Sequence, residues 1–428
     1  MKKVGIISLG CAKNRVDSEN ILGLIKDDGY TIVNSIEESD IVIINTCGFI
    51  DSSKRESIET IFEVLNNNKI VVVTGCLAQR YEKELAKEIP EVSFIPIHNY
   101  DEFNKYFSKV DKDLHRCDGL NDELRVISTP SYSAYLKIGE GCDNCCTYCA
   151  IPLIRGHFVS RPYDEIIDEA NKLAKDGYKE IIILEQDTTK YGIDLKEKKN
   201  IVDLLKGLLK IKELKYIRLL YLYPDEISDE LIELIGKEKR LTPYFDVPIQ
   251  HSEDHILKDM NRRGNKEFLI NLFKKIRDKV PNAVLRTTVM VGFPNETEED
   301  VDNLIKFMEE VKFDHLGAFT YSREEGTKSY DFINQIDEND KKKRLQKVIK
   351  AQQAISYKQN KLHINEIMEG IVIGKEKDNY LLRSYWNAPD DVDGKIYFKC
   401  DKSLKEGDIV KVKINEAFIY DLMGECVD

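Results

Sequence analysis

Short apolar runs with the composition of β-strands alternate with helical patterns along most of this 428-residue chain. Near the N-terminus these runs are VGIISL, IVIINT and KIVVVTG. Continuous apolar runs between helices are typical of parallel strands that are buried on both faces. The pattern predicts a parallel-sheet α/β domain, which we place at residues 1–112. Ser53 and Glu56 have the spacing of a capping box, so we expect a helix to begin beside Ser53.

The alternation restarts after this domain and gives six further strand candidates. These are AYLKIG, EIIILEQ, YIRLLYL, YFDVPIQ, AVLRTTVMVGF and HLGAFTYS. Six strand–helix units predict a partial (β/α)6 barrel, whose chemistry takes place at the carboxyl ends of the strands. A second doubly wound sheet has the same local pattern and remains an alternative. We place this unit at residues 128–361, where it ends on a long helix rich in Lys and Gln.

The C-terminal residues change character. The runs GIVIGKE, NYLLRSY, GKIYFKC and DIVKVKINEAF are separated by turns that contain Gly and Asp. Short strands spaced by such turns predict a small antiparallel β-barrel, which we place at residues 363–428. The chain is therefore expected to be of the α/β class and to contain three domains. The first two are α/β domains, and the last is all-β.

We expect the protein to be cytoplasmic. Its first apolar run is too short for the core of a signal peptide, and no run approaches the ~18 residues of a membrane span. In a reducing compartment, ten cysteines favour metal binding or catalysis over structural disulfides. The net charge of −12 opposes a large nonspecific nucleic-acid footprint, so we predict no membrane partner and no stable nucleic-acid partner.

Four of the cysteines lie close together in GEGCDNCCTYCAIPLIRG, residues 139–156. They can be taken as Cys142-x3-Cys146-x2-Cys149 or as Cys142-x2-Cys145-x3-Cys149. Either choice gives three thiolates with no nearby His, whereas a structural zinc site normally has four protein ligands. Three thiolates suit a 4Fe-4S cluster with one iron left open. The spacing therefore favours an iron–sulfur cluster over zinc or inert packing.

Three more cysteines, Cys11, Cys47 and Cys76, are far apart in sequence, but each directly follows a predicted parallel strand. A lone cysteine is more often a buried apolar residue than a ligand. Parallel strands of one sheet, however, end at the same edge, where open α/β sheets bind ligands. We therefore expect these thiolates to converge on a second cluster, with neighbouring glycines allowing close backbone approach. The other cysteines are interpreted as structural or free thiols: Cys117, Cys400 and Cys426.

Two three-cysteine sites in this order, followed by a small β-barrel, resemble the methylthiotransferases of the radical S-adenosylmethionine (SAM) superfamily. The resemblance spans the chain and implies a methylthiotransferase N-terminal domain, a radical SAM core and a TRAM domain. Within the family, the chain is most similar to the RimO-type branch, which modifies small-subunit ribosomal protein 12. The motifs that carry this are SLGCAKNRVDSE, LEQDTTKYGID, PIQH, TYSREEGT and RSYWNAPDDVDG. Ala12, Glu185 and the YPDE segment at 223–226 depart from the usual residues of the family.

The resemblance implies that a C–H bond at the β-carbon of an aspartate in that ribosomal protein is replaced by a methylthio group. General acid–base catalysis contributes too little to remove such a proton, so a radical from a cofactor is needed. The implied cofactors are SAM and two 4Fe-4S clusters, with an electron donor such as flavodoxin or ferredoxin. The implied metal ligands are Cys11, Cys47, Cys76, Cys142, Cys146 and Cys149. The residues expected to contact SAM are Tyr148, Gln186, Gln250, Arg286 and Gly292.

Two other functions remain open at this point. A sister family modifies adenosine in tRNA, but it usually has QSG where this chain has Gln250-His251-Ser252. Residues 364–428 contain nine Lys and Arg against fourteen Asp and Glu; phosphate contacts need cations, so a protein substrate is favoured. A two-cluster electron carrier is a remote alternative, because compact carriers use four cysteines per cluster. The polar residues near strand ends, Asp187 and His251 among them, can also be structural.

Overall fold

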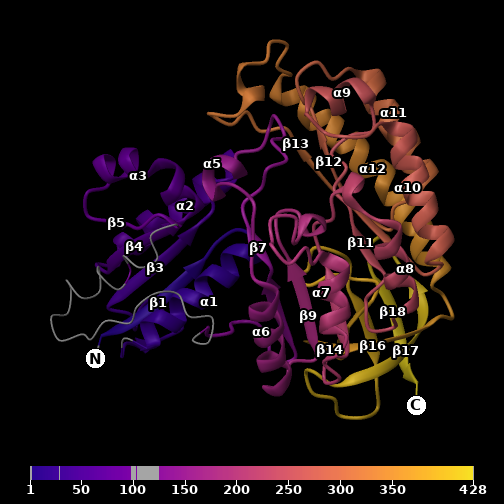
Figure 1. The fold of residues 1–428 in the computed structure, drawn as a ribbon, viewed down its shortest axis with the longest axis horizontal. Coiled ribbons are helices and arrows are strands. Elements are labelled where there is room, and N and C mark those ends of the chain that lie inside the picture. Colours follow the sequence, from indigo (N-terminus) through magenta and orange to yellow (C-terminus); the bar gives the residue numbers. More distant parts are fainter. Residues whose placement is uncertain (1, 28, 98–102, 104–124, 428) are drawn as a thin grey trace.

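The fold is described from a computed structural model of the chain (Figure 1). The structure describes residues 2–27, 29–97, 103 and 125–427. The N-terminal part of the chain (indigo to purple) lies beside a central barrel (magenta to orange), and the C-terminal strands (yellow) pack below the barrel. Cys117 lies outside the described residues, as does most of the segment between the first two predicted domains. The domain limits given above stay predictions.

The described strands of the N-terminal domain form one parallel sheet. Its elements are β1 (Lys3–Ser8), α1 (Ala12–Asp27), β2 (Thr31–Ile32), β3 (Ile41–Thr46), α2 (Asp51–Leu65), β4 (Ile70–Gly75), α3 (Cys76–Glu88) and β5 (Ser93–Phe94). The strand order is β2-β1-β3-β4-β5. Along β3, Ile41 and Ile43 pack with residues of α1, whereas Val42 and Ile44 pack with residues of α2 and α3. Helices therefore cover both faces of the sheet, as the continuous apolar runs predicted.

The capping-box prediction for α2 was wrong. The helix begins at Asp51, and its N-cap residue is Ile50, whose side chain makes no capping hydrogen bond. A tertiary contact further along the helix fixes its start instead. The Ser57 hydroxyl accepts a hydrogen bond from the Cys47 N–H (3.1 Å) and donates one to the Cys47 carbonyl (2.9 Å), so the helix is anchored to the loop that precedes it.

The central domain is a partial barrel of parallel strands. Residues 125–427 are described without a gap, and the barrel strands are β6 (Ser133–Lys137), β9 (Glu180–Leu184), β10 (Tyr216–Leu219), β11 (Tyr244–Asp246), β12 (Val284–Val291) and β13 (His315–Thr320). They pair in the orders β10-β9-β6 and β11-β12-β13. Two backbone hydrogen bonds join the two halves: the Ile217 N–H donates to the Arg240 carbonyl, and the Thr242 N–H donates to the Ile217 carbonyl. Spatial order follows chain order, which a doubly wound sheet would reverse, so the barrel prediction is confirmed.

Helices cover the outer face of the barrel, and their apolar sides form the largest hydrophobic core of the molecule. The other elements of this domain are β7 (Gly139–Glu140), α5 (Ile151–Arg155), β8 (Val159–Ser160), α6 (Tyr163–Lys175), η3 (Thr188–Lys190), α7 (Ile201–Leu208), η4 (Pro224–Glu226), α8 (Asp229–Lys237), α9 (Asp254–Asp259), α10 (Lys266–Lys279), α11 (Glu298–Val311), η5 (Lys328–Asp331) and α12 (Glu338–Leu362). In Figure 1, α5 lies on the side of the barrel that faces the N-terminal domain, and it contacts α3.

The C-terminal strands close into a small barrel. They are β14 (Ile367–Glu376), β15 (Asn379–Ser384), β16 (Ile396–Lys399), β17 (Ile409–Ala417) and β18 (Leu422–Val427), in the closed order β14-β15-β16-β18-β17. The predicted antiparallel arrangement holds for every neighbouring pair except β16 and β18, which run parallel. A closed ring with an odd number of strands cannot alternate direction throughout, so one such pair is unavoidable.

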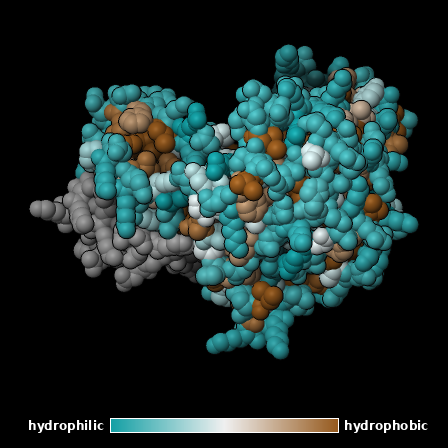
Figure 2. Space-filling view, turned by 90° about the horizontal axis from the view of Figure 1, so that it is seen from above, coloured by the Kyte–Doolittle hydropathy of each residue, from teal (hydrophilic) through white to brown (hydrophobic). Residues whose placement is uncertain are grey.

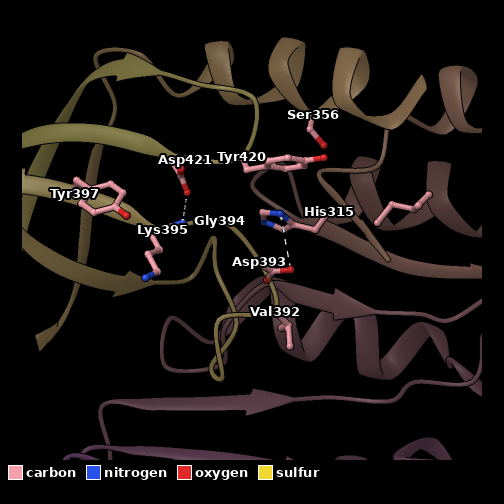
Figure 3. Close-up of a pocket in the computed structure, with 10 residues that line it drawn as sticks. His315, Ser356, Val392, Asp393, Gly394, Lys395, Tyr397, Tyr420 and Asp421 are labelled. Carbon is pink, nitrogen blue, oxygen red and sulfur yellow. Dashed lines mark hydrogen bonds and ion pairs between the residues drawn. The ribbon is translucent and has the colours of Figure 1, made fainter. Parts of the chain in front are cut away.

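The segment between β15 and β16, here called the floor segment (residues 385–395), fills the amino-terminal end of the central barrel. Trp386 is fully buried, and its carbonyl oxygen lies 2.8 Å from His315 Nε2. The Tyr244 hydroxyl donates to Asp393 Oδ2 (2.6 Å), and the Asp393 carboxylate also faces the His315 ring (Figure 3). Tyr244 and Trp386 belong to one hydrophobic core that spans both domains. The C-terminal domain therefore closes the barrel from below.

The surface is mostly polar on the side seen in Figure 2. Hydrophilic side chains cover most of this face, and one group of hydrophobic side chains gathers over the N-terminal domain at the left. No helix in the part of the chain that the structure describes combines the length and apolar composition needed to span a membrane.

Candidate functional site

A cavity of about 350 Å³ lies where the N-terminal domain meets the carboxyl ends of the barrel strands. Six cysteines line it, three from each domain: Cys11, Cys47, Cys76, Cys142, Cys146 and Cys149. The sequence predicted two separate three-cysteine sites, and the fold brings both to one space. Any ligand bound by one trio therefore shares its surroundings with the other.

The N-terminal trio sits at one edge of the sheet. Cys11, Cys47 and Cys76 follow β1, β3 and β4, which are adjacent parallel strands, so their placement agrees with the prediction from strand order. Gly10 has a left-handed backbone at φ 84°, and a Cβ there would lie 2.9 Å from Cys47 Cβ. Glycine is therefore required for the Cys11 turn to approach the Cys47 loop so closely.

Asn14, in the first turn of α1, ties these loops together. Its side-chain Nδ2 donates to the carbonyl oxygens of Leu9 (2.9 Å) and Thr46 (3.0 Å). Its Oδ1 lies 3.6 Å from Cys76 Sγ. One fully buried amide therefore touches all three cysteine-bearing segments, a role that sequence reasoning missed although Asn14 follows Cys11 closely in the chain.

The barrel trio lies in the loop between β7 and α5. The Cys149 N–H donates to the Cys146 carbonyl (3.0 Å), and the Ile151 N–H points at Cys149 Sγ (3.4 Å). Cys145, by contrast, is exposed, has a left-handed φ of 51° and does not line the cavity. The structure therefore favours Cys142, Cys146 and Cys149 as the set that acts together.

We expect the Cys145→Asn variant to retain wild-type iron content after anaerobic reconstitution, about eight irons for two 4Fe-4S clusters. Cys145 is exposed and does not line the cavity, and Asn tolerates the left-handed backbone. Iron analysis and the visible absorption of the clusters measure this. Loss of about half the iron would mean that Cys145, and not Cys146, is the ligand.

Each trio contains thiols that are weaker acids than a free cysteine. Burial, reinforced by neighbouring thiols of the same trio, raises the pKa of Cys76 and the pKa of Cys142 to about 11 each. A bound metal would have to displace these protons. Among the residues described, no three His, Cys, Asp or Glu side chains lie close enough to share a single metal ion. An iron–sulfur cluster makes a different demand, because each thiolate binds its own iron, and three thiolates per site suit it.

Four of the residues expected to contact SAM line the cavity: Tyr148, Gln186, Gln250 and Arg286. Gln250 has a left-handed φ of 71°. Its buried Oε1 has no hydrogen-bond partner among the described residues, and the same holds for Gln186 Oε1. Buried amide oxygens without partners are rare in folded proteins, and strained backbones gather at functional sites. Both side chains are therefore available to a ligand.

Gly292, the fifth of those residues, does not line the cavity. Its N–H donates to Glu296 Oε1 (2.8 Å), and a Cβ at this position would lie 2.3 Å from Lys341 Cγ. Packing against α12 explains why glycine is needed here. We therefore leave Gly292 out of the site proposed below.

Three other polar residues named from the sequence have protein partners. Arg286 lines the cavity, but its Nη1 pairs with Asp246 Oδ1 at 2.6 Å. His251 is fully buried with its Nε2 3.5 Å from Glu296 Oε2. Asp187 accepts a hydrogen bond (2.7 Å) from a side chain of the loop that carries the barrel cysteines. Asp187 and His251 thus each contact another residue of the protein, and neither lines the cavity.

Charged contacts between the two domains border the cavity, and the sequence did not reveal them. Glu324, after β13, accepts hydrogen bonds from Lys54 Nζ (2.9 Å) and Arg80 Nη1 (2.8 Å) of the N-terminal domain. Arg80 also donates to the carbonyl of Gly48, the residue after Cys47 (3.0 Å). The hydrogen bonds from these two cations help to hold the pKa of Glu324 below its usual value against the effect of burial.

Arg155, at the end of α5, makes a second connection. Its Nη2 donates to Asn14 Oδ1 (2.5 Å) and lies 3.5 Å from Cys76 Sγ, while its Nη1 pairs with Asp17 Oδ2 (2.6 Å). A barrel cation thus touches a cysteine of the N-terminal trio. Hydrogen bonds to ligand sulfurs are among the factors that set cluster potentials.

Three family models match successive parts of the chain. Residues 3–96 match "Uncharacterized protein family UPF0004", residues 136–308 match the radical SAM superfamily, and residues 364–427 match the TRAM domain. The barrel trio lies inside the radical SAM match. The N-terminal trio lies inside the first match, whose description assigns no chemistry.

Similar proteins cover the whole chain and share the name "Ribosomal protein uS12 methylthiotransferase RimO". The one from Caldanaerobacter subterraneus subsp. tengcongensis is 48% identical over 438 residues, which cover 99% of this chain and 100% of that protein. This chain belongs to the RimO family. Others of the name are 46% identical: that of Thermoanaerobacter sp. (99% and 100% covered) and that of Aquifex aeolicus (99% and 96%). As a RimO family member, the protein is a radical SAM methylthiotransferase, which implies SAM and a 4Fe-4S cluster.

Solved structures of more distant proteins share the fold of this RimO family member. The radical SAM methyltransferase TsrM from Kitasatospora setae has a TM-score of 0.54 at 13% identity, covering 74% of this chain and 73% of that one. The cobalamin-dependent SAM radical enzyme OxsB has a TM-score of 0.52 at 11% identity, covering 77% and 54%. Both are similar in fold alone.

Proposed function

We propose that this enzyme places a methylthio group on the β-carbon of an aspartate in ribosomal protein uS12. The observation that carries the proposal is the cavity in which six cysteines from two domains meet. A reaction that joins a carbon centre to a sulfur-containing group needs both partners at one point. The names of the full-length relatives supply the substrate protein.

The barrel thiolates Cys142, Cys146 and Cys149 would hold a 4Fe-4S cluster that also binds SAM, and the N-terminal trio would hold a second one. When bound, these groups supply the radical, the sulfur and the methyl group of the reaction. The residues fit them, because each site offers three thiolates and therefore leaves one iron for another ligand. This chain's own residues contribute by positioning the cofactors and the substrate.

For SAM contacts, we propose Tyr148, Gln186, Gln250 and Arg286. The two glutamine side chains have free buried oxygens that can accept hydrogen bonds from an amino or hydroxyl group. The Tyr148 ring packs edge-on against Phe293, at 6.5 Å between ring centroids, which fixes the backbone beside Cys149.

The partners follow from this proposal. The substrate is uS12, free or in the ribosome, and an electron donor such as flavodoxin or ferredoxin delivers the electrons that a radical SAM reaction consumes. Such a substrate places the enzyme in the cytoplasm. The acidic C-terminal domain suits a basic protein client better than a phosphate backbone.

The test is mass spectrometry of uS12 from cells with and without this gene. We expect the methylthio mass on one aspartate of uS12 in the first case and unmodified aspartate in the second. Unmodified uS12 in both strains, together with gene-dependent methylthio-adenosine in tRNA, would replace this proposal with the tRNA alternative.

The contact that Glu324 makes with the N-terminal domain should affect how tightly SAM cleavage is coupled to methylthio transfer. In the Glu324→Gln variant, the partly buried Lys54 and Arg80 lose the buried carboxylate that they share, which costs about 1–3 kcal/mol. We expect a lower melting temperature and more 5'-deoxyadenosine released per methylthio group transferred, because the domains no longer hold the two trios in one arrangement. The matched control is Glu325→Gln, since the Glu325 carboxylate is exposed and its side chain contacts Tyr81 at 3.3 Å. Equal coupling ratios in both variants would contradict this role.

A further inference from the structure

The charged residues that line the cavity differ in how well they are paired. They are Lys13, Arg155, Asp246, Arg262, Arg286 and Glu324. Arg155 pairs with Asp17, Arg286 pairs with Asp246, and Glu324 pairs with two cations of the N-terminal domain. These groups balance one another within the protein. Lys13 and Arg262 have no carboxylate within 4.0 Å among the described residues.

Arg262 belongs to the barrel trio. Its guanidinium lies 4.1 Å from the centre of the Tyr223 ring, donates to the Pro248 carbonyl and reaches Cys146 Sγ at 4.0 Å. Its hydrogen-bonding capacity is thus directed to the backbone and to a cysteine that we propose as a metal ligand. Arg262 therefore has partners at the barrel trio even when no acidic ligand is bound.

Lys13 is different. It is buried, with 8% of the residue exposed, and it lines the cavity. Within the described part of the chain, its ammonium makes no hydrogen bond or ion pair. It contacts the face of the Tyr221 ring, 3.7 Å from the centroid, and interacts electrostatically with the buried Glu185. An ammonium has three donors, and a buried charge normally has an anionic or hydrogen-bonding partner. The Lys13 ammonium therefore lacks a hydrogen-bonding anion, and a bound ligand can supply one.

The Tyr221 ring is held in place for this contact. Tyr221 has a left-handed φ of 61°, an unusual conformation for a bulky residue. Its N–H donates to Asp246 Oδ2 (3.0 Å), and its carbonyl accepts from the Thr188 N–H and hydroxyl (3.1 Å each). The backbone is thus fixed on both sides, and the ring supports Lys13 from the barrel side of the cavity. Strained positions of this kind gather at ligand sites.

We infer that Lys13 binds the side-chain carboxylate of the target aspartate. This rests on the proposed function, in which the reacting β-carbon is bonded directly to that carboxylate. A carboxylate that enters a buried cavity needs a cation and hydrogen-bond donors to replace water, and the Lys13 ammonium offers both. Lys13 follows Cys11 by two residues, so a carboxylate held there keeps the adjacent carbon beside the N-terminal trio. The same contact selects aspartate over its neutral isostere asparagine.

The test compares uS12 with uS12 in which the target aspartate is asparagine. With the reconstituted enzyme and SAM but no reductant, no turnover occurs, and dissociation constants are measured by titration. A charge-assisted contact is worth about 10- to 100-fold in affinity. We expect wild-type enzyme to prefer the aspartate protein by that factor, Lys13→Met to lose the preference, and Lys13→Arg to regain part of it. Under turnover, the ratio of kcat/KM values should follow the same order.

The matched control is Lys199→Met. Lys199 also places its ammonium over a tyrosine ring, 3.5 Å from the centroid of Tyr163, but it does not line the cavity. This variant should keep the wild-type preference for aspartate. Iron content and the electron paramagnetic resonance signals of the clusters, measured on each variant, separate loss of the substrate contact from damage to a cluster.

Each outcome is decisive for one of the two proposals. An unchanged aspartate preference in Lys13→Met would overturn the inference, as would a lost preference accompanied by altered cluster signals, because Lys13 would then serve the N-terminal trio. If wild-type enzyme modified no aspartate of uS12 under turnover, the proposed function would fail first. Wild-type binding of aspartate and asparagine proteins with equal affinity would overturn the inference and leave the proposed function standing.

Discussion

Replacing Cys142, Cys146 and Cys149 together by alanine should abolish the cleavage of SAM to 5'-deoxyadenosine. These thiolates are the proposed ligands of the barrel cluster, and without them the barrel has no means of delivering an electron to SAM. Iron content should fall from about eight to about four per chain, because the N-terminal trio lies on a different domain with its own core. Chromatography of the reaction products and iron analysis measure the two effects.

The control for this variant is Cys400→Ala, a cysteine that lies outside the cavity. It should keep full iron content and full SAM cleavage. If the triple variant still formed 5'-deoxyadenosine, that result would contradict the assignment of the radical chemistry to the barrel trio.

A Cys11, Cys47, Cys76 to alanine variant should separate the two halves of the reaction. We expect it to form 5'-deoxyadenosine but no methylthiolated uS12, since the barrel trio is intact and the proposed source of sulfur is gone. Product should fall below detection by mass spectrometry. The rate of SAM cleavage should change less, although Arg155 loses its contact with Cys76 Sγ (3.5 Å) and the cavity is altered on that side.

The same variant tests the alternative that the N-terminal trio is structural. Formation of methylthiolated product at the wild-type rate would show that the sulfur comes from elsewhere. Thermal unfolding provides the control. Cys11 and Cys47 lie in loops and Cys76 is the first residue of α3, and none of them belongs to the two cores that flank the sheet, so these cores should survive their replacement.

Local patterns predicted most of the fold and the six cysteines. The apolar runs around Ile43 and Ile182 could be recognised because a strand buried on both faces leaves a continuous apolar signature in sequence. The convergence of Cys11, Cys47 and Cys76 could be predicted because parallel neighbours end at one edge. The spacing alone left Cys145 and Cys146 open, since both choices give three thiolates, and the resemblance to radical SAM enzymes selected Cys146. The structure adds that Cys145 does not line the cavity.

Contacts between domains could not be read from the sequence. Glu324 and Arg80 are far apart in the chain, and nothing local to either residue indicates its partner. Lys13 was passed over for the same reason, because an unpaired ammonium can be recognised only when its whole environment is known. Gly292 was named from the motif around it, but its close approach to Lys341 of α12 could not be predicted, because no local pattern links these two residues.

The end of β15, just before the floor segment, also has a consequence for how the protein is made. Chains emerge from the ribosome N-terminus first, and domains fold as units when they are complete. The N-terminal sheet has its own hydrophobic cores. The barrel cannot complete its folding until β15 has been made. Arg218, on the inner face of the barrel, donates to the Ser384 carbonyl (2.7 Å), and Glu180 pairs with Arg383 (3.0 Å). A chain that stops before these residues exposes buried charges and apolar strands, the features that chaperones and proteases act on. Cellular quality control should therefore remove incomplete copies of this enzyme before they can bind SAM.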